Sequence, residues 1–122
     1  MEKQDQLKSL GIDEIAIYAV NDGAVMGAWA EDQKVSGIVK LYGDPLSELT
    51  KAMGVVLDHA GPMSVLGNPR CQRFSMYISN CKVKTFNLAA AEDDPAGDDR
   101  PEVSLVDKML ADLTAMQSKD EL

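Results

Sequence analysis

The order of apolar and turn-forming segments predicts an α/β fold. A nearly continuous apolar run over residues 13–20 is typical of a strand buried on both faces in a parallel sheet. Helical spacing of apolar residues follows two strand-like segments, and residues 73–88 alternate as a β-hairpin does. At 122 residues the chain has the length of a single domain, which we place over residues 1–117 with a tail over 118–122.

The first elements are a helix, a strand and a second helix. Residues 3–10 have helical composition and stop at Gly11. The strand over residues 13–20 is followed by Asp22, which is placed to cap a helix over residues 24–29. Trp29, in that helix, is expected in the core or at an interface.

A second strand over residues 38–42 leads into a third helix. Asp44 is predicted as its N-cap, Pro45 as its first residue and Gly54 as its end. The apolar stripe of this helix consists of Leu46, Leu49, Thr50 and Met53.

From residue 55 to residue 70 the glycines and prolines favour an irregular connection, with at most one helical turn around Met63 to Leu66. His59 lies in this segment without a second imidazole or a ligand cluster nearby in sequence, so we interpret it as a solvated loop residue.

The hairpin and a closing helix complete the predicted fold. Phe74, Met76 and Ile78 mark one face of the first hairpin strand, Asn80-Cys81 is the turn, and a bulge is expected near Thr85-Phe86. Ser104 and Asp107 resemble a capping box. The final helix carries the stripe Val106, Met109, Leu110, Leu113 and Met116.

The charge balance restricts the partners. With 12 basic and 20 acidic residues the formal net charge is −8, which disfavours binding to nucleic acid. No apolar run approaches the roughly 18 residues of a membrane helix, and we expect no signal peptide in the chain as written.

Two further segments are acidic or resemble a targeting signal. An acidic loop over residues 92–102 does not have the spacing of a calcium-binding EF-hand. The chain ends in Lys119-Asp120-Glu121-Leu122, the retrieval signal of the endoplasmic reticulum. This signal acts only on a protein that has entered the lumen, so the cytoplasm and the lumen or another organelle stay open as locations.

The two cysteines are not expected to pair. The hairpin strand between Cys71 and Cys81 separates them by roughly 30 Å, whereas a disulfide needs Cα atoms within about 7 Å. The pair also fits no metal or redox motif. Arg70 and Arg73 flank Cys71, which makes Cys71 the better candidate for a reactive thiol.

Several segments together resemble a type II, peroxiredoxin-5-like thiol peroxidase, a redoxin with a thioredoxin-like fold. The similarity runs from about Met1 to Leu113. The segments that carry it are Leu7-Lys8-Ser9-Leu10-Gly11-Ile12-Asp13-Glu14-Ile15, Val20-Asn21-Asp22, Ala28-Trp29, Asp44-Pro45, Arg73-Phe74-Ser75-Met76, Lys82-Val83-Lys84 and Asn87.

This resemblance implies that hydrogen peroxide and alkyl hydroperoxides are reduced by a cysteine thiolate, with a thiol reductant and no cofactor or metal. Arg73 matches the arginine that stabilises the thiolate and the departing oxygen in the family. Val65 and Leu66 match the apolar wall of the peroxide pocket. A homodimer or another protein partner is also implied.

The chain departs from the family pattern at its N-terminus. It begins where the cysteine-bearing helix would end, so the peroxidatic cysteine, its Thr-Pro and the central strand of the sheet are absent, and neither Cys71 nor Cys81 replaces that cysteine. The resolving cysteine of some members would fall near Val103. Unpaired buried backbone groups cost on the order of 1–3 kcal/mol each, against a whole stability of about 5–15 kcal/mol. Either the gene product is longer, or a partner supplies the strand, or the sheet is rearranged.

Three functional hypotheses follow. The chain is part of a peroxiredoxin whose N-terminal region is missing from this sequence, or a non-catalytic peroxiredoxin-derived subunit whose sheet another chain completes. The third hypothesis is a thiol module that uses Cys71 beside Arg73.

Overall fold

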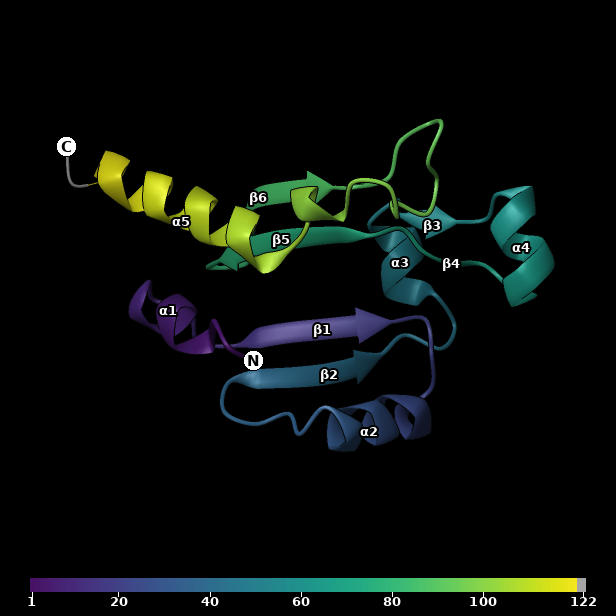
Figure 1. Ribbon diagram of the computed structural model, residues 1–122, viewed down its shortest axis with the longest axis horizontal. Helices are drawn as coiled ribbons and strands as arrows, with labels where there is room; N and C mark the ends of the chain where they lie inside the picture. Colours follow the sequence, from purple (N-terminus) through teal and green to yellow (C-terminus); the bar gives the residue numbers. More distant parts are fainter. Residues whose placement is uncertain (121–122) are drawn as a thin grey trace. The chain divides into compact units, whose positions relative to one another are not determined.

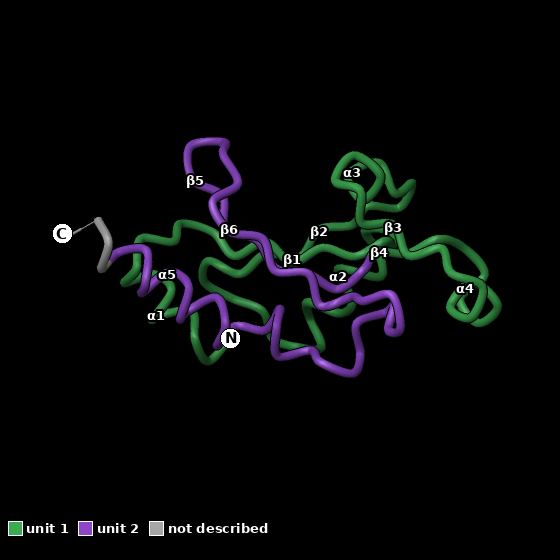
Figure 2. The backbone as a smooth tube through the Cα atoms, turned by 90° about the horizontal axis from the view of Figure 1, so that it is seen from above, with its two compact units in different colours: residues 1–71 green, residues 72–122 purple. Residues whose placement is uncertain are grey.

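The computed structural model describes residues 1–120, with side chains as far as Gln117. The chain divides into two compact units, Met1–Cys71 and Gln72–Leu122, which Figure 2 colours separately. Each unit is described by itself. No helix in the described part of the chain is both long and apolar enough to cross a membrane.

The first unit is built around two parallel strands (Figure 1). Its elements are α1 (Gln4–Ser9), β1 (Ile15–Ala19), α2 (Gly23–Asp32), β2 (Val39–Gly43), α3 (Glu48–Ala52), β3 (Val56–Leu57), α4 (Ala60–Leu66) and β4 (Arg70–Cys71). β1 pairs with β2 from Ile15 opposite Val39 to Ala19 opposite Gly43. The strands predicted over residues 13–20 and 38–42, and their parallel arrangement, are confirmed.

The start of α2 follows from the side chain of Asp22. This carboxylate accepts a hydrogen bond from the backbone N–H of Val25 at 2.9 Å, as an N-cap does. The predicted cap is confirmed, and the helix runs on to Asp32.

The predicted burial of β1 on both faces is wrong. Ala16 and Ile17 are exposed, and β1 pairs with β2 in a sheet of two strands. Trp29 is also exposed rather than in the core, and with Ile17 and Leu41 it lines an open apolar pocket of about 140 Å³. The apolar run therefore predicted the strand correctly but not its burial.

The third helix begins later than predicted. Asp44 does accept hydrogen bonds from the backbone N–H groups of Leu49 and Thr50, at 3.3 and 3.0 Å. A turn intervenes, however: Ser47 has φ +57° and its N–H donates to the Asp44 carbonyl, so α3 starts at Glu48 instead of Pro45. The predicted stripe is only partly right, because Thr50 is fully buried while Leu46 and Leu49 are exposed.

The segment over residues 55–70 is more regular than predicted. It contains β3, helix α4 and β4, and β3 pairs antiparallel with β4. Gly61 and Pro62 lie in the first turn of α4, where backbone N–H groups have no helical acceptor, so a proline costs little there. His59, at the N-cap position, is exposed as predicted.

The second unit contains the hairpin β5 (Phe74–Ser79) and β6 (Lys82–Leu88), the short helix η1 (Pro101–Val103) and helix α5 (Val106–Asp120). The turn is at Asn80 and Cys81, with φ of 51° and 63°. The register shifts between Tyr77, opposite Thr85, and Ile78, opposite Val83, so Lys84 is the extra residue. The hairpin, its turn and a bulge close to Thr85 are confirmed.

Helix α5 packs with the buried residue Leu113 at the centre of its predicted stripe. The capping box is not formed: the Ser104 hydroxyl donates to the carbonyl of Pro101 at 3.3 Å, because Ser104 closes η1. Within the predicted tail, the backbone is helical to Asp120. Residues 121–122 of the retrieval tetrapeptide lie outside the described residues.

β1 and β5 belong to different sheets. The strands of the described chain form three two-stranded sheets, β1 with β2, β3 with β4, and β5 with β6. The central strand that we expect between these two strands is not among the described residues, and its supply from elsewhere stays a prediction.

Candidate active site

Arg73 is held at the entrance of the hairpin by its backbone. Its carbonyl accepts a hydrogen bond of 2.9 Å from the N–H of Ala89, which extends the β5–β6 pairing by one step beyond Phe74 and Leu88. The arginine therefore has a fixed backbone position at the end of the hairpin opposite the turn.

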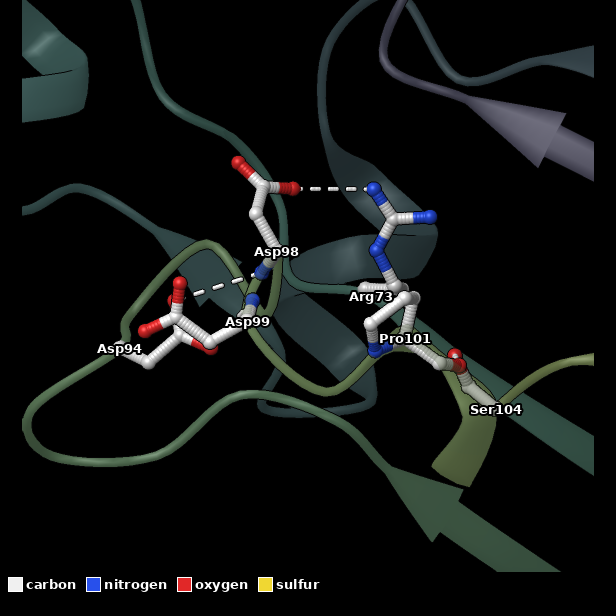
Figure 3. Close-up of polar contacts among 6 residues, drawn as sticks. All are labelled: Arg73, Asp94, Asp98, Asp99, Pro101 and Ser104. Atoms are coloured by element: carbon white, nitrogen blue, oxygen red, sulfur yellow. Dashed lines mark hydrogen bonds and ion pairs between the residues drawn. The ribbon is translucent and has the colours of Figure 1, made fainter.

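The guanidinium of Arg73 pairs with Asp98. One terminal nitrogen, Nη2, donates to Oδ1 of Asp98 at 3.0 Å, and both side chains are substantially exposed, at 42% and 70% (Figure 3). Such an exposed pair contributes only about 0–1 kcal/mol to stability.

Asp98 lies in a loop organised by Asp94. The Asp94 carboxylate accepts from the backbone N–H groups of Asp98 and Asp99, at 3.3 and 3.0 Å. Ala91 and Asp94 also exchange backbone hydrogen bonds of 2.9 and 3.0 Å. The acidic segment that the sequence indicated as an irregular loop is therefore a folded turn in this structure.

Cys71 lies in a polar cluster of the first unit. Its Sγ is 3.2 Å from the hydroxyl of Tyr18, which is itself 3.4 Å from the hydroxyl of Thr50. Thr50 donates to Asp44 at 2.7 Å. Four elements or connections, β1, the turn after β2, α3 and β4, thus meet through hydrogen bonds around this thiol.

The electrostatics of this cluster make Cys71 a poor nucleophile. Burial raises the pKa of the Cys71 thiol, against a smaller lowering by hydrogen bonds with Tyr18 and Thr50. Burial, together with the hydrogen bond to Cys71, raises the pKa of Tyr18 to about 12. Both groups are consequently neutral near pH 7.

Asp44 is the charged member of the cluster. Burial raises its pKa, but the hydrogen bonds from Thr50 and from backbone N–H groups at the start of α3 outweigh that effect, so the pKa lies below its ordinary value. Asp44 therefore anchors α3 as a carboxylate.

Arg70, which precedes Cys71, is engaged elsewhere. Its Nη1 donates to the carbonyl of Val20 at 2.6 Å and to the side-chain oxygen of Asn21 at 2.9 Å. The flanking arginine that the sequence suggested as an activator of Cys71 thus makes hydrogen bonds at the end of β1.

The other predicted residues are exposed. Val65 and Leu66 lie at the end of α4, with 83% and 45% of their surfaces exposed. Both belong to the first unit, whereas Arg73 belongs to the second. Cys81 is an exposed thiol at the hairpin turn, whereas the thiol of Cys71 is half-buried.

Two side-chain contacts of the candidate site were not predicted from the sequence. The pairing of Asp98 with Arg73 and the contact of Tyr18 with Cys71 join residues 25 and 53 positions apart. The only local signal was the turn-rich composition around Pro95 and Gly97. Within the described residues no group of histidine, cysteine and carboxylate side chains could hold a metal ion.

The chain is similar to plant peroxiredoxins. It is 37% identical over 89 residues to peroxiredoxin-2C of Oryza sativa, covering 72% of this chain and 52% of the relative. It is 34% identical over 90 residues to the mitochondrial peroxiredoxin-2F of Arabidopsis thaliana, covering 74% and 43%. No protein-family model matches the chain.

Solved structures share the fold. Reduced Prx3 of Vibrio vulnificus, in complex with hydrogen peroxide, has a TM-score of 0.79 and 36% identity over 95% of this chain and 65% of its own. The chain is therefore similar to peroxiredoxins in both sequence and structure. Peroxiredoxin 5 of Alvinella pompejana follows with a TM-score of 0.71 and 28% identity, over 96% and 64%.

The chain has the thioredoxin-like α/β fold of its structural neighbours, which confirms the fold class predicted from the sequence. It spans about half the length of the curated relatives it matches and about two thirds of the solved chains.

Proposed function

We propose that the protein to which this chain belongs reduces hydroperoxides, hydrogen peroxide among them, through a cysteine thiolate, and that Arg73 serves this reaction. The observation that carries the proposal is the likeness to Prx3 of Vibrio vulnificus, solved with hydrogen peroxide, over 95% of this chain. The geometry of Arg73 supports it, because a backbone-anchored guanidinium at the surface suits binding of an anion.

The reaction proposed is a displacement at oxygen. A thiolate sulfur attacks one peroxide oxygen, the O–O bond breaks, and the products are a sulfenic acid and an alkoxide or hydroxide that takes up a proton. Two reductant thiols then return the sulfenic acid to the thiol: the oxygen leaves as water and the two reductant sulfurs form a disulfide. The guanidinium of Arg73 stabilises the negative charge on sulfur and on the departing oxygen.

The reacting thiolate in this proposal is a residue outside these 122. Burial and a raised pKa argue against Cys71, and Cys81 is at the tip of the hairpin turn, away in sequence from Arg73. The proposal also places Val65 and Leu66 in the wall of the peroxide pocket, where their exposed apolar surfaces would receive the organic part of a hydroperoxide. A second copy or another protein as partner belongs to the same proposal.

Substitution of Arg73 by methionine in the natural protein tests this function. We expect kcat/KM for hydrogen peroxide to fall by about 10²-fold, the usual effect of removing one electrostatic stabiliser of the transition state. The free energy of unfolding should change little, because the Arg73 pair is exposed. The measurement is peroxide consumption coupled to a thiol reductant, followed with circular dichroism as a check of folding.

Arg100→Met is the matched control, since Arg100 is exposed and lies in the same unit. Its kinetics should equal those of the wild type. Unchanged kcat/KM in Arg73→Met would remove Arg73 from the site, and absence of peroxide consumption by the natural protein would favour the non-catalytic subunit.

A further inference from the structure

The loop over residues 91–99 is built so that it presents one carboxylate to Arg73. Asp94 fixes the backbone of Asp98 and Asp99 through its carboxylate, and its carbonyl accepts from the N–H of Gly97 at 3.1 Å. Figure 3 shows Asp98 reaching the guanidinium while Asp99 and Asp94 lie on the other side of the turn. Of these three neighbouring acidic residues, one is paired with the arginine.

Gly97 allows this loop to lie directly against Arg73. Its φ is +78°, and a Cβ atom added there would be 3.2 Å from the Cβ of Arg73 and 3.2 Å from the backbone carbon of Ala89. A side chain at residue 97 would therefore combine backbone strain with crowding against the Arg73 side chain and the backbone of Ala89. The glycine is a requirement of the close approach between loop and arginine.

The contact with Asp98 uses only part of the guanidinium. Nη2 donates to Asp98 at 3.0 Å, whereas Nε and Nη1 have no hydrogen-bond acceptor among the described residues. In Figure 3 the second terminal nitrogen points away from Asp98. A guanidinium has five N–H donors in a planar fork, so it binds a second anion while one edge stays on the carboxylate.

We propose that Asp98 is a positioning residue, which holds Arg73 by Nη2 so that its remaining N–H donors face the reacting anion. The inference rests on the proposed function of Arg73. An exposed ion pair adds little to stability. Because the Arg73–Asp98 pair is exposed, we assign it a role in orienting the guanidinium. An arginine side chain without this anchor would sample several rotamers, and the loss would appear in catalysis.

Chemical modification of Arg73 tests whether Asp98 holds the guanidinium, a contact we call the clamp. This test needs no assumption about the peroxidase reaction. Phenylglyoxal closes a ring on both terminal nitrogens of an arginine, and Asp98 occupies one of them. In the natural protein, Asp98→Asn should raise the rate of phenylglyoxal modification at Arg73 by about threefold or more, as expected for loss of one exposed charge pair. The exposed Arg100, in the same digest, is the internal reference for this rate. Peptide mass spectrometry measures both rates.

Two further variants separate placement from charge. Asp99→Asn removes the same charge one residue away and should leave the rate at Arg73 unchanged. Gly97→Ala keeps Asp98 but strains the loop, so it should accelerate modification as Asp98→Asn does. Equal modification of Arg73 in wild type and Asp98→Asn, or an equal acceleration by Asp99→Asn, would overturn the clamp.

Peroxide kinetics then test the positioning role. Asp98→Asn should lower kcat/KM by about threefold to tenfold, less than Arg73→Met does, and Asp98→Glu should restore part of the loss. A clamp detected with phenylglyoxal but without an effect on kcat/KM overturns the positioning role alone. An unaltered rate in Arg73→Met overturns the proposed function instead, so the two failures are distinct.

Discussion

The environment of a thiol, more than the charge of its sequence neighbours, determines its reactivity in this chain. Arg70 and Arg73 flank Cys71 in sequence, yet Arg70 donates to Val20 and Asn21, and Arg73 pairs with Asp98. The pKa of Cys71 is raised because burial disfavours the thiolate. A half-buried neutral thiol beside a tyrosine hydroxyl is suited to packing.

Alkylation with iodoacetamide should therefore distinguish the two cysteines. At pH 8 in the folded natural protein we expect Cys81, exposed at the turn, to react several-fold faster than Cys71. A raised pKa means less thiolate at a given pH, so the rate at Cys71 should keep rising at pH values where an ordinary thiol, with a pKa of about 8.5, is already levelling off. Mass spectrometry of the two peptides measures both rates.

The control is the same reaction in concentrated urea, where both cysteines should react alike. Folded protein in which Cys71 reacts as fast as Cys81 would contradict the assignment of Cys71 as a half-buried neutral thiol.

Helix α5 is joined to the hairpin by a polar link beside its apolar stripe. Asp112 accepts from the side chain of Asn87 at 2.8 Å and from Lys108 at 2.5 Å. The hydrogen bonds from Lys108 and Asn87 lower the pKa of Asp112. A group with a lowered pKa in the folded state stabilises the fold above its unfolded pKa, and this stabilisation is lost as the pH falls.

Asp112→Asn should lower the free energy of unfolding at pH 7 by about 1–2 kcal/mol, because it weakens two hydrogen bonds to a charged acceptor. The difference from the wild type should shrink as the pH falls below about 4, where the carboxyl of the unfolded chain is protonated. Urea unfolding at pH 7 and at low pH measures it.

Asp93→Asn, an exposed carboxylate in the loop after β6, is the control and should be within about 0.5 kcal/mol of the wild type at both pH values. An Asp112→Asn variant that is as stable as the wild type at pH 7 would show that α5 depends on its apolar stripe alone.

Across the whole chain, the apolar surface is incompletely covered. Among the described residues, buried apolar side chains include Leu7, Val20, Met26, Val55, Leu57 and Leu113, whereas Ile17, Trp29, Leu46, Val65, Ile78 and Phe86 are exposed. Each of the three sheets has two strands, and two-stranded sheets are marginal in water. The single domain over residues 1–117 and the supply of a further strand from outside this chain stay predictions.

The 122-residue chain alone should therefore bind the dye ANS and unfold with a shallow dependence on urea, because exposed apolar surface and a small core accompany loose packing. The natural protein should have a mass several kilodaltons above 13.2 kDa, should not bind ANS and should unfold cooperatively. Fluorescence and intact mass measure these properties. A natural monomer of 13.2 kDa that unfolds cooperatively without ANS binding would contradict this prediction.

The order of the elements, the capping of α2 by Asp22, the hairpin turn at Asn80 and the stripe of α5 were determined by the sequence itself. Each of these signals acts within a few residues, through a cap, a turn conformation or a repeating apolar face. The similarity to peroxiredoxins was also predicted from the order of short segments, and the structural neighbours confirm it.

The late start of α3, the two turns of α4, the raised pKa of Cys71 and the pairing of Arg73 with Asp98 were decided by the tertiary structure. The contacts of Tyr18 with Cys71 and of Arg73 with Asp98 join groups 53 and 25 residues apart. A thiol's burial and a guanidinium's partner depend on which distant groups the folded chain brings within about 3 Å. Local composition carries no information on the distance between side chains that are far apart in the sequence. The pKa and the hydrogen-bond partners of these side chains were therefore determined by the tertiary structure.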